Sequence, residues 1–183
     1  AGISIVSHGE RNPAQRRWVK TFFDEQVQPL LVPVLLDPAH PFPQVASKSL
    51  NFIVQLDGAD AFGRDNTIAI VKVPRVLPRV IALPPRLCAG RRLFGSLSSV
   101  IRAHLQALFP GRQVGKFSQF RVTRHSDLAI DEDDVKNLRM ALRQGLQHRH
   151  YGEATRIEVS SGCSEDLSAL LLKQFSLPSA ALY

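Results

Sequence analysis

The chain has 183 residues, of which 44% are hydrophobic and 21% charged, proportions that are ordinary for a globular protein. No run of about 18 or more apolar residues occurs, so the sequence predicts no transmembrane segment. The two cysteines are too few for a disulfide framework, which disfavours an exported protein and favours a cytoplasmic one. Because the sequence lacks a starting Met and ends without a tail, we expect it to be a piece of a longer protein.

The formal net charge of +7 is unevenly distributed along the chain. Residues 66–126 contain 11 Lys or Arg and no Asp or Glu, whereas from residue 127 onward nine acids outnumber six bases. A basic segment inside a folded domain is typical of a surface that meets a polyanion or an acidic neighbour. A solvated basic face without a ligand would have the same composition, so charge alone leaves both interpretations open.

The first predicted elements are a short strand at residues 3–7 and an amphipathic helix. The helix should begin at Asn12 as N-cap, with a proline in its first turn and Gln15 placed to complete a capping box. Its apolar side chains recur at helical spacing, and Pro29 should end it. Residues 29–43 contain five prolines and predict an extended connector.

A run of strands is predicted in the middle of the chain. Residues 51–57 and 67–73 predict a hairpin, because a polar loop rich in Gly and Asp joins them. Residues 79–84 and 113–124 predict two further strands. A helix with one apolar face lies between them and should be capped by Ser96.

The last third of the chain predicts two helices and a strand. Residues 131–151 predict a helix whose acids crowd the first turn, where the helix dipole favours them. A strand at residues 155–161 and a helix capped by Ser164 should follow. Because strands and helices alternate irregularly, we predict an α+β fold in which helices pack against a mixed, largely antiparallel sheet in a single domain.

Arginine directly follows proline twice between two of the predicted strands, at Pro74-Arg75 and Pro78-Arg79. Proline cannot donate to a sheet ladder, so both prolines should lie outside paired positions, in a connector. Arg75 and Arg79 should therefore lie near a strand end, where long side chains can lean into a cleft. The alternative is an edge connector whose arginines are simply solvated.

No catalytic or metal-binding set can be assembled from the sequence. Gly111–Lys116 resembles a phosphate loop, but its glycines are one residue too close and it leads into a strand rather than a helix. His148–His150 lacks accompanying Cys or carboxylate ligands, and Asp131–Asp134 is explained more simply as a charged helix start. Ser164 as a helix cap accounts for the sequence around Cys163. No nucleic-acid-binding module frames the basic segment either, because stacking aromatics are few.

Four long segments resemble, in the same order, the middle (head) domain of bacterial polyphosphate kinases. They are residues 18–43, 60–85, 118–142 and 153–177, which begin WVKTFFDEQ, DAFGRDNTI, SQFRVTRHS and EATRIEVSS. The resemblance covers nearly the whole chain, and only its beginning matches weakly. It implies that residues 1–11 are the end of a preceding segment and residues 12–183 the middle domain.

The resemblance implies a parent enzyme that reversibly transfers the terminal phosphate of ATP to inorganic polyphosphate. In that family the reaction passes through a phosphohistidine in a site built by two C-terminal domains, with Mg²⁺ and with help from a helical N-terminal domain. No motif for that chemistry matches here, so the resemblance assigns no catalytic residue, metal ligand or cofactor to this chain. It implies a scaffold that contacts the parent's own N-terminal and C-terminal domains and takes part in a homo-oligomer.

Polyphosphate carries about one negative charge per phosphate, so a basic lining would raise its local concentration. We hypothesise that Arg75, Arg79 and Arg124 form part of a rim that steers polyphosphate. Arg121 and Arg124 point to opposite faces of one predicted strand, and Arg124 is chosen because it lies nearer the strand end. The alternatives are a basic nucleic-acid-binding module, for which no specific nucleic acid is expected, and a purely oligomer-forming module.

Overall fold

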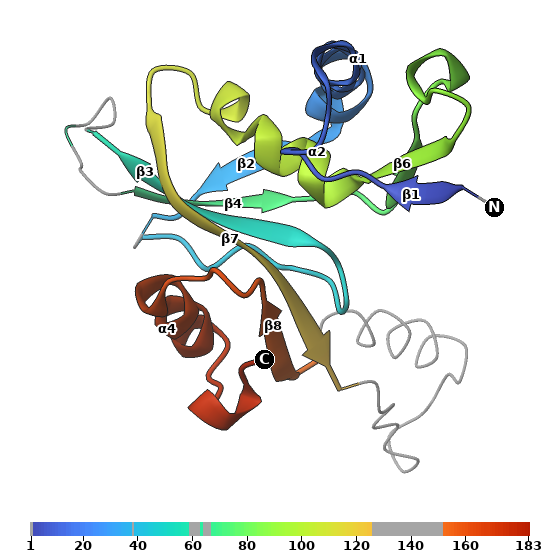
Figure 1. Ribbon diagram of the computed structural model, residues 1–183. Helices are drawn as coiled ribbons and strands as arrows, with labels where there is room; N and C mark the ends of the chain where they lie inside the picture. The colour runs from blue at the N-terminus through green and yellow to red at the C-terminus, as the bar shows by residue number, and fades with distance from the viewer. Residues whose placement is uncertain (1, 38, 59–62, 64–66, 126–151) are drawn as a thin grey trace, which may run out of the picture.

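A five-stranded sheet forms the centre of the computed structural model, which describes residues 2–37, 39–58, 63, 67–125 and 152–183. The strands run in the order β2-β4-β3-β7-β8, and every neighbouring pair is antiparallel. Their bounds are Val32–Leu35 for β2, Asn51–Asp57 for β3, Thr67–Lys72 for β4, Gln113–Arg124 for β7 and Ala154–Val159 for β8. Helices cover both faces of this sheet (Figure 1).

A second, three-stranded sheet has the order β1-β6-β5. It consists of β1 (Ile3–Ile5), β5 (Val80–Ala82) and β6 (Arg92–Ser96). Strand β1 pairs parallel to β6, and β5 pairs antiparallel to it. The predicted α+β class, with largely antiparallel strands and packed helices, is confirmed, and the strands are divided between two sheets.

Helix α1 (Pro13–Phe22) begins where the sequence predicts it. The Gln15 backbone N–H donates to Asn12 Oδ1 at 2.9 Å, and the Asn12 N–H donates to Gln15 Oε1 at 3.0 Å, so the capping box is complete. The helix continues as a π-helical turn, Phe23–Val27, and then a 3₁₀ turn, Gln28–Leu30. The α-helix therefore ends seven residues before Pro29, which lies inside the 3₁₀ turn, and the helical stretch as a whole ends at Leu30, one residue after the proline.

The remaining helices lie on either side of β7 in the chain. Helix α2 (Leu97–Ala103) is capped by Ser96, whose Oγ accepts from the Ser99 N–H at 3.2 Å, and a 3₁₀ turn, Leu105–Leu108, follows it. Helix α4 (Glu165–Gln174) has Ser164 at its N-cap position, but that hydroxyl is buried without a hydrogen-bond partner. Short 3₁₀ turns occur at Pro85–Leu87 and Ser179–Ala181. The helix predicted for residues 131–151 lies outside the described residues.

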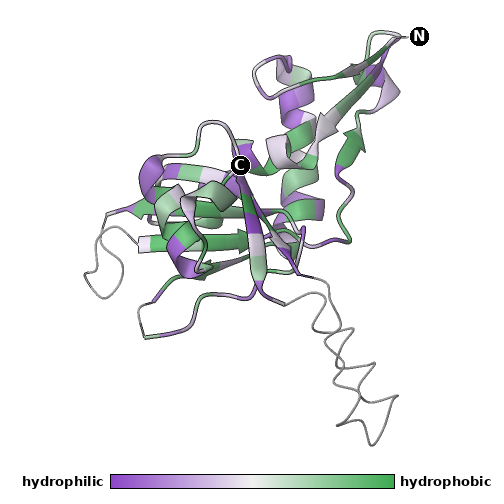
Figure 2. Ribbon diagram, turned by 90° about the horizontal axis from the view of Figure 1, so that it is seen from below, coloured by the Kyte–Doolittle hydropathy of each residue, from purple (hydrophilic) through white to green (hydrophobic). Residues whose placement is uncertain are grey.

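The alternation of side chains along the strands builds two cores. Phe52 and Val54 of β3 pack on the side of α1 and α2, whereas Ile53 packs with Phe120 of β7 on the side of α4. Successive strand residues point to opposite faces, so a strand covered on both sides must be apolar throughout. Figure 2 shows this as nearly continuous hydrophobic colouring along the central strands.

Two strands lie where the sequence predicts none. The stretch expected to be an extended connector, residues 29–43, contains β2, which pairs with β4 through Val32↔Lys72 to Leu35↔Ala69. Pro33 is tolerated because β2 is an edge strand, where a missing N–H breaks no essential ladder bond. The sequence pattern also does not predict strand β6. Among the described residues, no helix has the length and apolar character needed to cross a membrane.

Candidate polyanion-binding surface

The Pro-Arg stretch is the connector between the two sheets. Strand β4 ends at Lys72 in the large sheet, and β5 begins at Val80 in the small one. Pro74 and Pro78 thus lie outside paired positions, as the sequence predicts. Leu77, only 6% exposed, anchors the connector in the core and leaves the arginines beside it at the surface.

The two connector arginines lie close enough to influence each other. Arg75 is exposed, and its Nη2 donates to the carbonyl oxygen of Ser47 at 2.7 Å. Partial burial, and to a smaller extent the positive charge of Arg75, lowers the pKa of Arg79. Two positive charges held this close repel each other, and a bound anion would reduce that repulsion.

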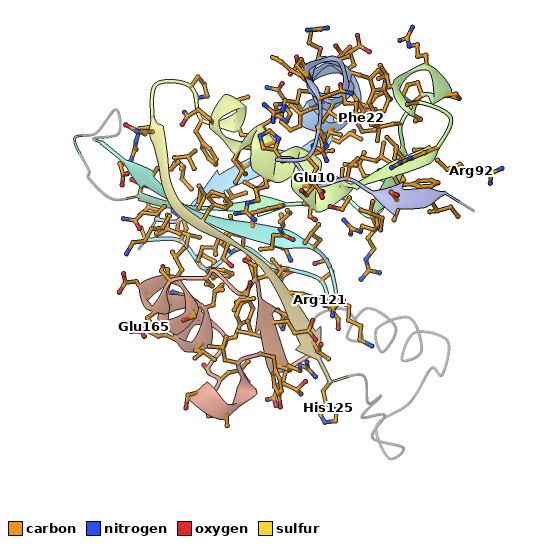
Figure 3. All side chains as sticks on the ribbon, viewed as in Figure 1. Glu10, Phe22, Arg92, Arg121, His125 and Glu165 are labelled. Carbon is orange, nitrogen blue, oxygen red and sulfur yellow. The ribbon has the colours of Figure 1, made fainter. Side chains whose placement is uncertain are left out.

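Arg79 lines a pocket of about 370 Å³ with Lys48, Arg121 and Glu158, which we call the connector pocket. The Lys48 N–H donates to the Val122 carbonyl oxygen at 2.7 Å, which holds Lys48 against β7. Arg121 of the same strand is labelled in Figure 3. Three cations therefore meet one carboxylate. Arg75 lines a neighbouring pocket of about 450 Å³ together with Lys72.

The single carboxylate of the connector pocket is shared. Glu158 pairs with Arg121, whose Nε donates to it at 2.6 Å, and with Arg156, whose Nη2 lies 3.2 Å from the other carboxylate oxygen. One negative charge cannot neutralise two guanidinium groups, so the pocket remains net positive. This is the arrangement expected of a surface that attracts polyanions.

Arg124 lies elsewhere, in a pocket of about 250 Å³ that Phe175 also lines. Its Nε donates to the Val45 carbonyl oxygen at 3.1 Å, its Nη1 donates to the Gly152 carbonyl oxygen at 2.7 Å, and its guanidinium carbon is 5.4 Å from the Phe175 ring centroid. The expectation that Arg124, and not Arg121, shares a cleft with Arg79 is therefore not met. Nearness to the strand end does not bring Arg124 to Arg79, because the face of β7 that carries Arg124 is the face that α4 covers. A role for Arg124 in polyanion binding stays a prediction.

A second basic region surrounds a pocket of about 640 Å³, which we call the serine pocket. The loop before α1 contributes His8, the N-cap and first turn of α2 contribute three serines, and the last turn of α2 contributes a cation. Its lining includes His8, Ser96, Ser98, Ser99, Arg102 and Gln119. The sequence reveals this pocket only through its lack of acids, because its parts are far apart in the chain.

The pKa of His8 should lie below the ordinary value of 6.5. Burial lowers it first, followed by the charges of Arg11, Arg16, His104 and Arg102. Because the folded chain takes up this proton less readily than the unfolded one, the stability that His8 contributes should be lost as pH falls below 6.5. An NMR titration of the ring measures the pKa directly.

Replacing Arg16 with Gln should move the pKa of His8 part of the way back. Arg86→Gln is the matched control, because Arg86 is an exposed arginine on the turn Pro85–Leu87 and does not line the serine pocket. A wild-type pKa at or above the ordinary value would contradict the positive potential assigned to this pocket.

Neither pocket offers a metal centre. Among the residues that the structure describes, no group of three or more His, Cys, Asp or Glu side chains could hold a metal ion. Cys88 is buried, and its Sγ donates to the carbonyl oxygens of Leu83 and Pro84 at 3.5 and 3.1 Å. His148–His150 and Asp131–Asp134, weighed as metal sites in the sequence, lie outside the described residues.

Comparison with known proteins identifies the family. A family profile described as "Polyphosphate kinase middle domain" matches residues 14–183. A polyphosphate kinase of Neisseria meningitidis serogroup C (strain 053442) is 48% identical over 182 residues, which cover 100% of this chain and 27% of that protein. A polyphosphate kinase of Pseudomonas aeruginosa is 48% identical over 168 residues, covering 92% of this chain and 24% of that protein.

The crystal structure of polyphosphate kinase from Porphyromonas gingivalis has the same fold. It matches with a TM-score of 0.75 and 22% identity over 100% of this chain and 25% of that one. The chain therefore spans about a quarter of the length of the relatives it matches. The profile and the curated relatives agree along its length, and the chain belongs to the polyphosphate kinase middle-domain family.

Proposed function

We propose that this chain is the middle domain of a cytoplasmic enzyme that reversibly transfers the terminal phosphate of ATP to inorganic polyphosphate. The relatives named polyphosphate kinase, each about four times as long, support this proposal. In it, the parent enzyme's other domains bind ATP and Mg²⁺ and carry the catalytic groups. Among the described residues, no group of His, Cys, Asp or Glu side chains offers a ligand set for Mg²⁺.

The chain's own contribution is a basic path for polyphosphate, and the observation that carries it is the connector pocket. Lys48, Arg79 and Arg121 surround one carboxylate that a further arginine already shares. Arginine suits a polymer of phosphates, because its planar fork grips two oxygens and stays charged at any working pH. Arg75, beside Arg79, extends the positive surface along the connector.

A second role, as a scaffold in contact with other domains or another copy, is favoured by the outer face of the small sheet. The pairing register places Ile3 and Ile5 of β1 and Val80 of β5 on one face, and these side chains are 61%, 68% and 56% exposed. Exposed apolar faces of this kind are typical of interaction surfaces. Arg92 on the same face projects away from the molecule (Figure 3), and we propose that this face meets the parent's own domains or a homo-oligomer partner.

Because we propose that the catalytic groups belong to other domains, we expect the 183-residue chain alone to make no polyphosphate from ATP and Mg²⁺. The full-length parent should make it. The reason is that no nucleophile, base and phosphate-binding set is brought together among the described residues. Synthesis followed with radiolabelled ATP measures both proteins under the same conditions. Synthesis by the isolated chain would overturn the proposal that the catalytic groups belong to other domains, and an inactive parent would overturn the proposed reaction.

A further inference from the structure

Arg11 is a buried cation that pairs with no carboxylate among the residues that the structure describes. It is 2% exposed, and its Nη2 donates to Ser99 Oγ at 2.8 Å and to the Val6 carbonyl oxygen at 3.5 Å. Its Nε and Nη1 are buried and have no hydrogen-bond partner. Gly95 makes room for it, since a Cβ at that position would come within 3.1 Å of Nη2. Charges are seldom buried unpaired, because removal from water strongly disfavours them.

The nearest acid in the sequence does not neutralise Arg11. Glu10 is exposed, and its carboxylate accepts from the Ser7 N–H at 2.7 Å. The elements on the other side of the pocket, α2 and β7, come from the part of the chain that contains no Asp or Glu. Arg16 adds a further positive charge, and its Nη2 donates to the Gly9 carbonyl oxygen at 3.3 Å. Among the described residues no acidic side chain pairs with Arg11, so positive charge predominates behind the serine pocket.

Two hydroxyl groups of the pocket, those of Ser96 and Ser99, are left free to donate. Ser99 Oγ accepts from Arg11, and Ser96 Oγ accepts from the Ser99 N–H and from Ser98 Oγ, both at 3.2 Å. A hydroxyl that accepts in this way still has its own proton to give. The link from Arg11 through Ser99 also polarises that hydroxyl, which makes it a stronger donor.

The donors of the pocket match an oxyanion with several acceptor oxygens. Arg102 is exposed, lines the pocket and lies over the Phe117 ring at 5.6 Å from its centroid, which leaves its fork available for bidentate contacts. A carboxylate has two acceptor oxygens, whereas a phosphate has four, and serine hydroxyls with arginine are typical phosphate partners.

We propose that the serine pocket binds a phosphate group, with Ser96, Ser99 and Arg102 in contact and Arg11 supplying charge from behind. This site is separate from the connector pocket, with which it shares only Gln119. It does not depend on the proposed enzyme reaction, because inorganic phosphate alone tests it. The phosphate could be free orthophosphate or a unit of a polyphosphate chain.

Isothermal titration of the 183-residue chain with orthophosphate should give saturable binding. Ser99→Ala and Arg102→Gln should each weaken it about tenfold, as expected for charge-assisted hydrogen bonds. Arg86→Gln, which removes the same charge elsewhere, should leave it unchanged. The His8 ring resonances should shift in the wild-type titration and respond far less in Arg102→Gln. Tripolyphosphate that binds more tightly at these residues would mark a polymer site, and equal affinity would mark a free-phosphate site.

Absence of saturable binding, or equal weakening in Arg86→Gln and Arg102→Gln, would overturn the proposal. Arg11→Met gives a second test, because it replaces the unpaired charge by an apolar side chain of similar length. This variant should bind phosphate more weakly without loss of thermal stability. If Arg11→Met fails to fold, Ser99→Ala decides, since it deletes a single oxygen from a half-buried side chain.

Discussion

Replacing Phe52 with Ala should lower the free energy of unfolding by about 3–5 kcal/mol, the usual cost of deleting a fully buried aromatic ring. Phe52 is 0% exposed and lies in β3, the middle strand of the five-stranded sheet. It packs in the core that α1 and α2 cover, where the neighbouring backbone is held by ladder bonds on both sides and cannot collapse into the space. Urea denaturation followed by circular dichroism measures the change.

Val76→Ala is the matched control for a truncation at the surface. Val76 is 78% exposed, so Val76→Ala should change the free energy of unfolding by no more than about 0.5 kcal/mol. A comparable loss in both variants would mean that Phe52 is not in a packed core.

Phe120→Ala tests whether the two cores unfold together. Phe120 is 1% exposed in the core beneath α4, on the opposite face of the sheet from Phe52. Because β3 and β7 belong to both cores, both variants should shift one common transition rather than split it. Two separate transitions would show that the helices on the two faces stabilise independent units.

Much of the local structure could be predicted because its causes are local. Asn12 and Ser96 predict helix starts, because their side chains can accept from N–H groups three residues further along the chain. The β3–β4 hairpin follows from two apolar runs joined by a turn-rich loop. The prolines of the connector exclude pairing by their own chemistry, whatever the rest of the chain does.

The parts that the sequence did not reveal depend on distant partners. Strand β2 becomes a strand because β4 offers it an edge, and β6 because β1 and β5 flank it. Short strands of this kind carry little periodicity of their own. Their existence is decided by non-local pairing, which local patterns do not encode.

In the candidate sites too, some residues are placed by local causes and others by contacts with distant parts of the chain. The positions of Arg75 and Arg79 followed from the prolines beside them, whereas Lys48 reaches the connector pocket only because its loop packs on β7. The sequence does not show that α4 covers the face of β7 that carries Arg124, so it cannot distinguish Arg121 from Arg124. The burial of Arg11 could not be foreseen either, because Gly95 and Ser99, which accommodate it, are distant in the chain.

In the full-length enzyme, removal of charge from the connector pocket should raise the KM for polyphosphate. Each of Lys48→Gln and Arg79→Gln should raise it about fivefold at low ionic strength, which corresponds to about 1 kcal/mol for one lost contact between unit charges in water. The kcat should stay nearly constant, because we propose that the reacting groups belong to other domains. Arg86→Gln again controls for net charge.

Two further measurements test this explanation of the change in KM: its dependence on salt, and the KM of the variant Arg124→Gln. The difference in KM should shrink as the Debye length falls from about 30 Å at 0.01 M salt to about 3 Å at 1 M, since the effect is long-range attraction. Arg124→Gln should instead lower thermal stability with little change in KM, because its guanidinium holds the Val45 and Gly152 carbonyl oxygens. A KM unchanged at low salt in Lys48→Gln and Arg79→Gln would assign these cations to folding or subunit contact. A raised KM in Arg124→Gln at unchanged stability would restore the rim of Arg75, Arg79 and Arg124 that the sequence suggested.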